Sequence, residues 1–337
     1  MPDRRNEPRS PWPLEAWYVA CTPDELDSGP LGRRICDEPM VIFRGDDGQV
    51  AILEDFCPHR GAPLSKGFLD GGHIVCGYHG MTFNCAGRAV AMVGQAVERL
   101  PSVRTFAALE RHGFVWVWPG DAAKADPAAL PDFFWSGNPA WVYGGGRFHI
   151  ACDYRLMIDN LMDLTHETYV HATSIGQKEI EEAPVSTRID GNEVVTERYM
   201  QEVDAPPFWR AALKGGGLPE DAKVDRWQVC RFSLPSHVMI EVGVALAGRG
   251  GLQAAPQDKV SSVVVDFITP ETSTTHHYFW GMARSFGVED AALTDTIRQG
   301  QGKIFSEDLA MLEGQQANLS RVPERRLLTL NIDAGGA

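Results

Sequence analysis

The chain has 337 residues, 44% of them hydrophobic and 23% charged. It contains no apolar run of about eighteen residues, so the sequence excludes a membrane-spanning or disordered protein and predicts a substantial core. Its 45 acidic and 31 basic residues give a formal charge of −14, which disfavours nucleic acid and anionic membranes as partners. The polar, Pro-rich start lacks the apolar core of a secretory signal, so we expect a cytoplasmic protein.

The first third of the chain is typical of short strands separated by turns. The β-rich runs lie at residues 17–21, 40–53, 73–83 and 113–120. Within the second run, the segment Gly45-Asp-Asp-Gly48 predicts a β-hairpin. We therefore predict an all-β domain over residues 1–120. Pro and Ala then replace the strand pattern, and we predict a linker over residues 121–140.

The remainder of the chain, residues 141–337, has a mixed pattern. Strands are predicted around residues 147–154, 192–203 and 259–270, a short helix near 156–169 and a longer helix at 291–318. This order predicts an α+β domain. The glycine triplets at 144–146 and 215–217 do not form a dinucleotide-binding G-x-G-x-x-G motif, so nicotinamide or flavin chemistry must come from another polypeptide.

Two Cys/His pairs lie in the predicted all-β domain. Cys57 and His59 are followed, after sixteen residues, by Cys76 and His79. Structural zinc sites usually take both cysteines from one loop and both histidines from the other, whereas here each loop supplies one of each. The pattern favours a Rieske [2Fe–2S] centre, in which one iron has two thiolate ligands and the other has two imidazoles. Structural zinc is the alternative.

A second group of polar residues interrupts an apolar helical run. Asn160, Asp163 and His166 are spaced three apart and form one stripe on a helix. His171 lies five residues beyond His166, about 140° around a regular helix, so we predict that the helix ends or widens between the two histidines, as in a π-bulge. Asp163 is predicted to accept a hydrogen bond from the His166 nitrogen that does not bind metal.

A non-haem iron site needs a carboxylate in addition to two histidines. The helix at 291–318 offers Glu307, Asp308 and Glu313. On a helical projection, Asp308 lies in the middle of an apolar stripe that includes Met311, Glu307 lies at its flank, and Glu313 lies on the opposite face. Because a buried carboxylate is costly unless it is paired or metal-bound, we predict Asp308 as the third ligand.

With both groups present in this order, the sequence resembles the Rieske non-haem iron oxygenases over nearly its whole length. The resemblance is carried by segments such as EDFCPHRGAPLS, VCGYHG, DYRLMIDNLMDLTHETYVH and IRQGQGKIFSEDLAMLEGQQ. It implies an N-terminal Rieske domain, a C-terminal helix-grip (START-like) catalytic domain and a head-to-tail homotrimer.

The resemblance also implies the cofactors and their ligands. A [2Fe–2S] cluster is expected at Cys57, His59, Cys76 and His79, and a mononuclear Fe(II) at His166, His171 and Asp308. Asp163 is expected to bridge His166 and a cluster histidine of the neighbouring subunit. Asn160 is expected close to the iron.

The activity implied by the resemblance is that of a terminal oxygenase. It would demethylate vanillate to protocatechuate and formaldehyde, using O₂ and electrons from a separate NADH-dependent flavin and iron–sulfur reductase. Another methoxybenzoate, the methyl group of an aryl sulfonate, or phthalate are alternative substrates for the same machinery. A Rieske-type electron carrier is the alternative from another class, but it leaves residues 141–337 without a role. Arg231 and His237 are the candidates for binding a substrate carboxylate.

Overall fold

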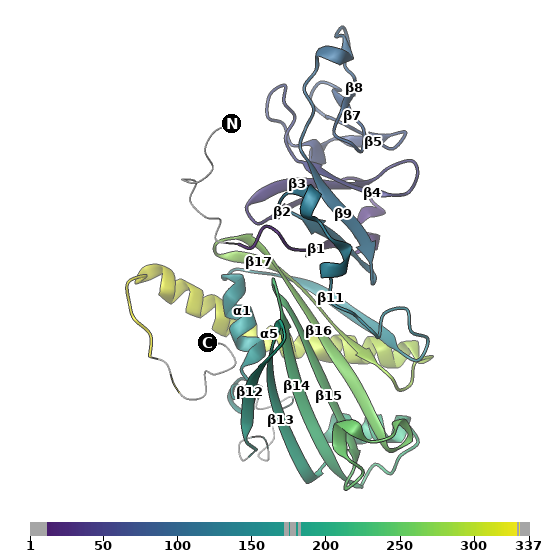
Figure 1. Ribbon diagram of the computed structural model, residues 1–337, viewed down its shortest axis with the longest axis vertical. Helices are drawn as coiled ribbons and strands as arrows, with labels where there is room; N and C mark the ends of the chain where they lie inside the picture. Colours follow the sequence, from purple (N-terminus) through teal and green to yellow (C-terminus); the bar gives the residue numbers. More distant parts are fainter. Residues whose placement is uncertain (1–11, 172–174, 176–179, 181–182, 329, 331–337) are drawn as a thin grey trace. The chain divides into compact units, whose positions relative to one another are not determined.

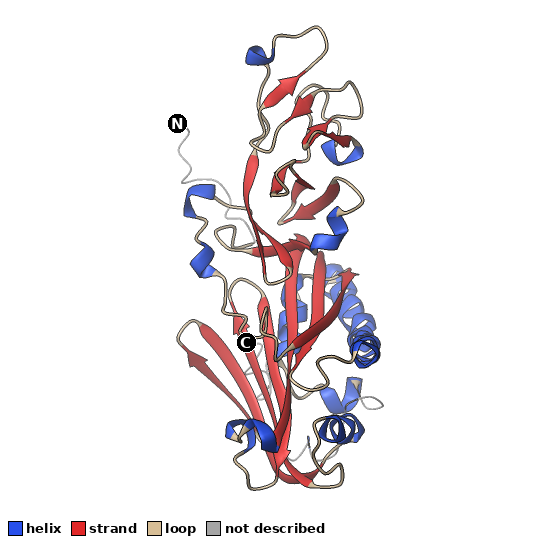
Figure 2. Ribbon diagram, turned by 90° about the vertical axis from the view of Figure 1, so that its right-hand side faces the viewer, coloured by secondary structure: helices blue, strands red, loops and turns tan. Residues whose placement is uncertain are grey.

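The computed structural model of the protein describes residues 12–171, 175, 180, 183–328 and 330. The chain divides into two compact units, Met1–Pro131 with Thr269–Ser273, and Asp132–Ile268 with Thr274–Ala337. Figures 1 and 2 show that the first unit is built mainly from strands and that the second combines a large sheet with helices. The boundary between the units falls inside the segment where the sequence predicts a linker.

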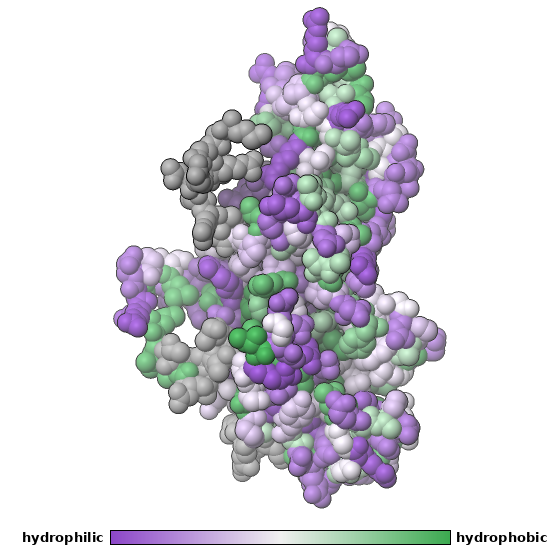
Figure 3. Space-filling view, viewed as in Figure 1, coloured by the Kyte–Doolittle hydropathy of each residue, from purple (hydrophilic) through white to green (hydrophobic). Residues whose placement is uncertain are grey.

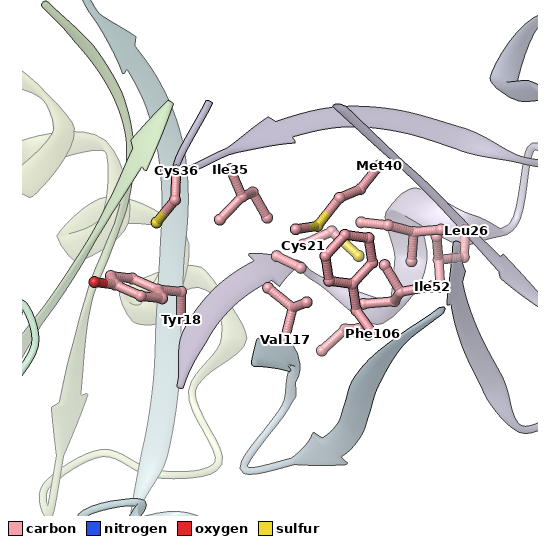
Figure 4. Packing of buried hydrophobic residues seen from close by; sticks show 12 residues of the cluster. Tyr18, Cys21, Leu26, Ile35, Cys36, Met40, Ile52, Phe106 and Val117 are labelled. Carbon is pink, nitrogen blue, oxygen red and sulfur yellow. The ribbon is translucent and has the colours of Figure 1, made fainter. Parts of the chain in front are cut away.

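The first unit contains two sheets, as expected for an all-β domain. The larger has the order β1-β10-β9-β4-β3-β2, with β1 (Tyr18–Cys21), β2 (Leu31–Ile35), β3 (Glu38–Arg44), β4 (Val50–Glu54), β9 (Thr105–Arg111) and β10 (Phe114–Trp118). The smaller has the order β5-β6-β7-β8, with β5 (Phe68–Asp70), β6 (His73–Val75), β7 (Thr82–Phe83) and β8 (Ala89–Ala91). Figure 4 shows the apolar cluster of the larger sheet, in which Ile35, Met40 and Val117 are fully buried.

The predicted hairpin joins β3 and β4. The Gly45 N–H donates to the Gln49 carbonyl at 2.9 Å, and Gly48 has a φ of +77°, in the left-handed region that favours glycine. The prediction from the Gly-Asp-Asp-Gly segment is therefore confirmed.

The second unit is built on a seven-stranded sheet with the order β11-β17-β16-β15-β14-β13-β12. Its strands are β11 (Val142–Ile150), β12 (Val185–Asp190), β13 (Glu193–Asp204), β14 (Lys223–Ser233), β15 (His237–Leu246), β16 (Lys259–Thr272) and β17 (Thr275–Arg284). The described helices are α1 (Tyr154–Met162), α2 (Glu167–Val170), α4 (Pro207–Gly215) and α5 (Ala291–Arg321). The long α5 packs on this sheet, and the α+β helix-grip prediction is confirmed.

The two faces of this sheet have different neighbours. Val224, Val244 and Val260 pack with residues of α4 and α5, and we call their side of the sheet the helix-covered face. Because side chains alternate along a strand, Trp227 and Val229 lie on the opposite face, in a separate apolar cluster. A residue's position along its strand therefore decides whether it faces the helices.

The glycine triplet of β11 allows close packing around Trp280. A Cβ on Gly145 would lie 2.2 Å from the Trp280 carbonyl oxygen, and one on Gly146 would lie 2.7 Å from the Trp280 ring. On the helix, a Cβ on Gly302 would lie 3.0 Å from the same ring. These glycines thus bring β11, Trp280 and α5 close together, which explains the triplet without a nucleotide-binding role.

The helices differ in detail from the prediction. The expected helix near residues 156–169 is divided into α1 and α2, and the helix expected at 291–318 extends over Ala291–Arg321. Helix α4 was not predicted, although its buried Trp209, Ala212 and Leu213 follow helical spacing. Among the helices of the described segments, none is long and apolar enough to cross a membrane. The face shown in Figure 3 intersperses hydrophilic and hydrophobic residues.

Candidate metal centres

Two loops of the first unit share the same backbone hydrogen bond. The Gly61 N–H donates to the Cys57 carbonyl at 2.8 Å, and the Gly80 N–H donates to the Cys76 carbonyl at 2.9 Å. The φ angles of the two glycines are +68° and +75°, a region that most other residues avoid. The loops are therefore two copies of one tight turn, each carrying a cysteine and a histidine.

The four predicted residues of these loops are brought together as two pairs. Cys57 and Cys76 are each 2% exposed, and burial together with the neighbouring Cys76 thiol raises the pKa of the Cys57 thiol. His59 and His79 are exposed, and their ring centroids are 4.5 Å apart. A buried pair of thiols and an exposed pair of imidazoles is the arrangement required when each pair binds its own iron.

The same geometry disfavours structural zinc. A tetrahedral zinc ion needs four donor atoms around one point. Among the described residues, one group of three or more His, Cys, Asp or Glu side chains has donor atoms that all lie within 4.8 Å of one another. This group consists of His166, His171 and Asp308. The four loop residues do not surround a single point.

The second candidate site begins where α1 ends. Asp163 follows the last residue of α1, and its carboxylate accepts hydrogen bonds from the Thr165 N–H (2.7 Å) and hydroxyl (2.6 Å). Such a side-chain turn competes with the helix and stops it. A break that was not predicted therefore lies before His166. The predicted end between the two histidines is also found, because α2 stops at Val170 and His166 and His171 flank its single turn.

The partners of the two imidazoles indicate which nitrogen carries the proton. His166 Nδ1 lies 2.6 Å from the Asp163 backbone carbonyl, and His171 Nδ1 lies 2.8 Å from Glu307 Oε2. A carbonyl or a carboxylate can only accept, so each Nδ1 is assigned as the donor, and in the neutral imidazole each Nε2 keeps its lone pair for a metal ion. The prediction that the Asp163 carboxylate binds His166 is wrong, because His166 Nδ1 contacts the Asp163 backbone carbonyl instead, while the carboxylate accepts from Thr165.

Three acceptor groups face one another at this site. The two Nε2 atoms are 3.3 Å apart, and the Asp308 oxygens lie 3.7 Å from His166 Nε2 and 3.4 Å from His171 Nε2. Asp308 is 3% exposed, and the Asn160 side-chain amide donates to it at 3.1 Å. Converging acceptors repel unless a positive charge lies among them. Two imidazoles and one carboxylate are the ligand set of a mononuclear non-haem iron.

The electrostatics also favour a cation. Burial alone lowers the pKa of His171, but the carboxylates of Asp308 and Glu307 outweigh this and raise its pKa above the ordinary value. Two carboxylates therefore favour positive charge at this imidazole, supplied by a proton or by a metal ion. The donor set fits iron, and both imidazoles are held by acceptors on their second nitrogen, as metal-binding histidines usually are.

Helix α5 carries the carboxylates largely as predicted. Asp308 is buried, but Met311, which the prediction placed in the same apolar stripe, is 62% exposed. Glu313 lies away from the site and accepts a hydrogen bond from the Ala151 N–H. Glu307 was not predicted to take part. Its place at the flank of the stripe, next to Asp308, was the only signal for its contact with His171.

The candidates for a substrate carboxylate lie on the wrong face of the sheet. Arg231 alternates with the helix-covered positions of β14 and pairs with Glu193 and Glu241 at 3.6 and 3.5 Å. His237 is in register with Ser233 and Phe267, and its ring meets the Phe267 ring edge-on. Both lie opposite the face that carries the site, so the prediction of a substrate-binding role is wrong.

Comparisons with known proteins agree with these two centres. A model of the Rieske [2Fe-2S] domain matches residues 16–106, and a model of the vanillate O-demethylase oxygenase C-terminal domain matches residues 150–337. The vanillate O-demethylase oxygenase subunit of Pseudomonas sp. (strain HR199 / DSM 7063) is 64% identical, covering 96% of this chain and 92% of its own. The subunit of Pseudomonas sp. (strain ATCC 19151) is 67% identical, covering 90% of this chain and 92% of its own. A crystal structure of dicamba monooxygenase with non-heme iron and dicamba has a TM-score of 0.80 at 33% identity, with 96% and 94% covered.

Proposed function

Since the chain belongs to the Rieske non-haem iron oxygenases, within the group of vanillate O-demethylase oxygenase subunits, we propose that its substrate is vanillate. Demethylation converts vanillate, O₂, two electrons and two protons into protocatechuate, formaldehyde and water. The relatives at 64% and 67% identity support the substrate. The observation that carries the oxygenase chemistry is the convergence of two imidazole Nε2 atoms and the Asp308 carboxylate at a single point.

We propose ligands for both metal centres. Cys57, His59, Cys76 and His79 would hold the [2Fe–2S] cluster, and His166, His171 and Asp308 would hold the mononuclear iron. When bound, the cluster supplies electrons one at a time and the iron activates oxygen. The limits proposed for the domains are residues 1–120 and 141–337, joined by the linker 121–140.

The surrounding residues hold these ligands in place. The Asp163 carbonyl and the Glu307 carboxylate accept from the Nδ1–H groups, so both Nε2 atoms are directed toward Asp308. The Asn160 amide donates to Asp308 Oδ1 and orients that carboxylate. Because Asp163 adjoins the site through its carbonyl, we retain it as the proposed link to a cluster histidine of a neighbouring subunit in a homotrimer.

An oxygenase subunit of this kind works with a separate reductase. We propose that this partner is an NADH-dependent flavin and iron–sulfur protein and that the reaction takes place in the cytoplasm. The exposed His59 and His79 support electron entry at the two cluster loops, because exposed ligands shorten the path to a docked protein.

A single-turnover experiment tests the substrate. The purified protein is reduced chemically without oxygen, mixed with O₂ and vanillate, and analysed for protocatechuate and formaldehyde. Equal amounts of both products support the proposal. Product from another methoxybenzoate, toluene-4-sulfonate or phthalate, with none from vanillate, reassigns the substrate. Cluster reoxidation with no product from any of these compounds indicates an electron carrier instead. The Asp308→Ala variant is the control for reactions outside the site.

A further inference from the structure

Three polar side chains are buried between α2 and the sheet. Glu167 on α2, Arg198 on β13 and Gln228 on β14 are each at most 5% exposed. Arg198 and Gln228 are direct cross-strand partners, so both project from the helix-covered face. They form one connected hydrogen-bond network with Glu167.

The contacts in this network are short and specific. Gln228 Nε2 donates to both carboxylate oxygens of Glu167, at 2.8 and 3.1 Å, and Arg198 Nη1 donates to Gln228 Oε1 at 3.1 Å. Arg198 Nη2 donates to the Leu164 backbone carbonyl at 2.5 Å. The sheet therefore holds the chain two residues before His166 and one residue after it.

Stability alone is a poor explanation for these buried charges. Burial lowers the pKa of Arg198, although the Glu167 carboxylate, 3.9 Å from its Nη1, opposes that change. Apolar residues often replace a buried ion pair without loss of stability. Helix α2, however, has only four residues, and a single turn does not maintain its own geometry.

We propose that Arg198, Gln228 and Glu167 are positioning residues that fix the backbone on both sides of His166, so that the imidazoles of His166 and His171 converge before the metal binds. This inference rests on the proposed function, because it takes both histidines as iron ligands. Holding ligands in their bound geometry removes the ordering cost of binding, so the network should raise the affinity for the metal.

Cobalt binding tests this role without relying on turnover. Protein with its cluster intact and its mononuclear iron removed is titrated with Co(II), and binding is followed by the difference between the EPR spectra of aqueous and protein-bound high-spin Co(II). The oxidised [2Fe–2S] cluster has no EPR signal and does not interfere. Arg198→Met and Gln228→Met remove the donors but keep side-chain length, and each should raise the Co(II) Kd by about ten- to a hundred-fold. Arg198→Lys keeps the charge with a single donor group and should have a smaller effect.

Two control substitutions lie on β14, the strand of Gln228, but their side chains project from the opposite face of the sheet. Arg231→Met removes an arginine of β14 outside the network, and Val229→Ala creates a cavity in the opposite apolar cluster. Val229→Ala should lower the Tm and leave the Co(II) Kd unchanged. The inference is overturned if Arg198→Met, Arg198→Lys and Gln228→Met bind Co(II) like the parent, or if Val229→Ala weakens binding as much as they do. If His166→Ala binds Co(II) like the parent, the proposed iron site itself is wrong.

Discussion

Glu307 Oε2 lies 2.8 Å from Nδ1 of His171, while the neighbouring Asp308 faces Nε2 of the same ring. Two consecutive residues of α5 thus contact opposite nitrogens of one imidazole. Glu307 keeps the proton on Nδ1, which leaves the Nε2 lone pair directed toward Asp308 and available to a metal ion.

Glu307→Ala should therefore weaken iron binding by about ten- to a hundred-fold and leave the cluster intact. The reason is that His171 loses the acceptor that fixes its tautomer and ring orientation. Iron affinity is measured by titrating the iron-depleted protein. Glu313→Gln, on the same helix but away from the site, is the matched control and should bind iron like the parent. If both variants bound iron with equal affinity, Glu307 would have no role in holding His171 for the metal.

Asp308→Ala should abolish turnover and retain the visible spectrum of the Rieske cluster. Loss of a direct ligand should cost more than the roughly hundredfold ceiling expected for an outer hydrogen-bond partner. Product formation and the visible absorption spectrum are measured on the same sample. Demethylation at the parent rate would show that the iron is bound elsewhere, and loss of the cluster spectrum would show that the substitution is not local.

Gly145→Ala should destabilise the protein by about 1–3 kcal/mol. The added Cβ would lie 2.2 Å from the Trp280 carbonyl oxygen and 2.3 Å from the Tyr143 hydroxyl, so the strands must move. Gly300→Ala is the contrasting control. It lies in α5 with no heavy atom within 4 Å of the new Cβ, and it should stabilise the protein by about 0.5–1 kcal/mol. The stability of both variants is measured by thermal unfolding. A neutral Gly145→Ala would contradict the close packing.

Asp266 should make stability depend on pH. Complete burial raises the pKa of Asp266 from 3.8 to about 8, the Tyr278 hydroxyl opposes this with a hydrogen bond at 2.6 Å, and the Asp308 charge adds to it. The folded state therefore keeps a proton that the unfolded chain loses above pH 3.8, so this stabilisation is complete below that pH and falls as the pH rises toward about 8.

The free energy of unfolding should fall by at most about 1.4 kcal/mol per pH unit because of Asp266. This dependence should be absent from Asp266→Asn, which stays neutral and keeps an acceptor for Tyr278. Denaturant unfolding is compared for the two proteins between pH 5 and pH 8, roughly the window set by this shift. The variant should gain stability relative to the parent as the pH rises. A constant difference across this range would show that Asp266 is ionised in the folded protein.

The sequence predicted those parts of the site that depend on local spacing. The Cys/His pairs of both loops, the polar stripe and the buried Asp308 are readable from residue type and period. The position of the helix break could not be predicted from spacing. The Asp163 side chain accepts hydrogen bonds from Thr165 and so forms a local turn, and tertiary packing decides between this turn and a continued helix. The roles of Glu307 and Glu167 depend on partners about 136 and 61 positions away, which no local pattern contains.

The same limit explains the error at Arg231. Its charge suggested a substrate contact, but strand alternation and register place it on the face opposite the one that α4 and α5 cover. A shift of one residue along β14 would have reversed that outcome. The chemistry of a residue was thus easier to predict than the face of the sheet from which its side chain projects.

Within its described length, α5 has 31 residues but buries only Gln301, Phe305, Asp308 and Leu312. One of these four is a proposed iron ligand, and Asn160, 148 positions earlier in the chain, already bonds to it. An ion shared by α2 and α5 would act as a cross-link that closes a very long loop, with the entropic benefit of a disulfide and none of its permanence. Loss of iron should then loosen the C-terminal half of α5 first, and amide hydrogen exchange there would report how fully the enzyme is loaded.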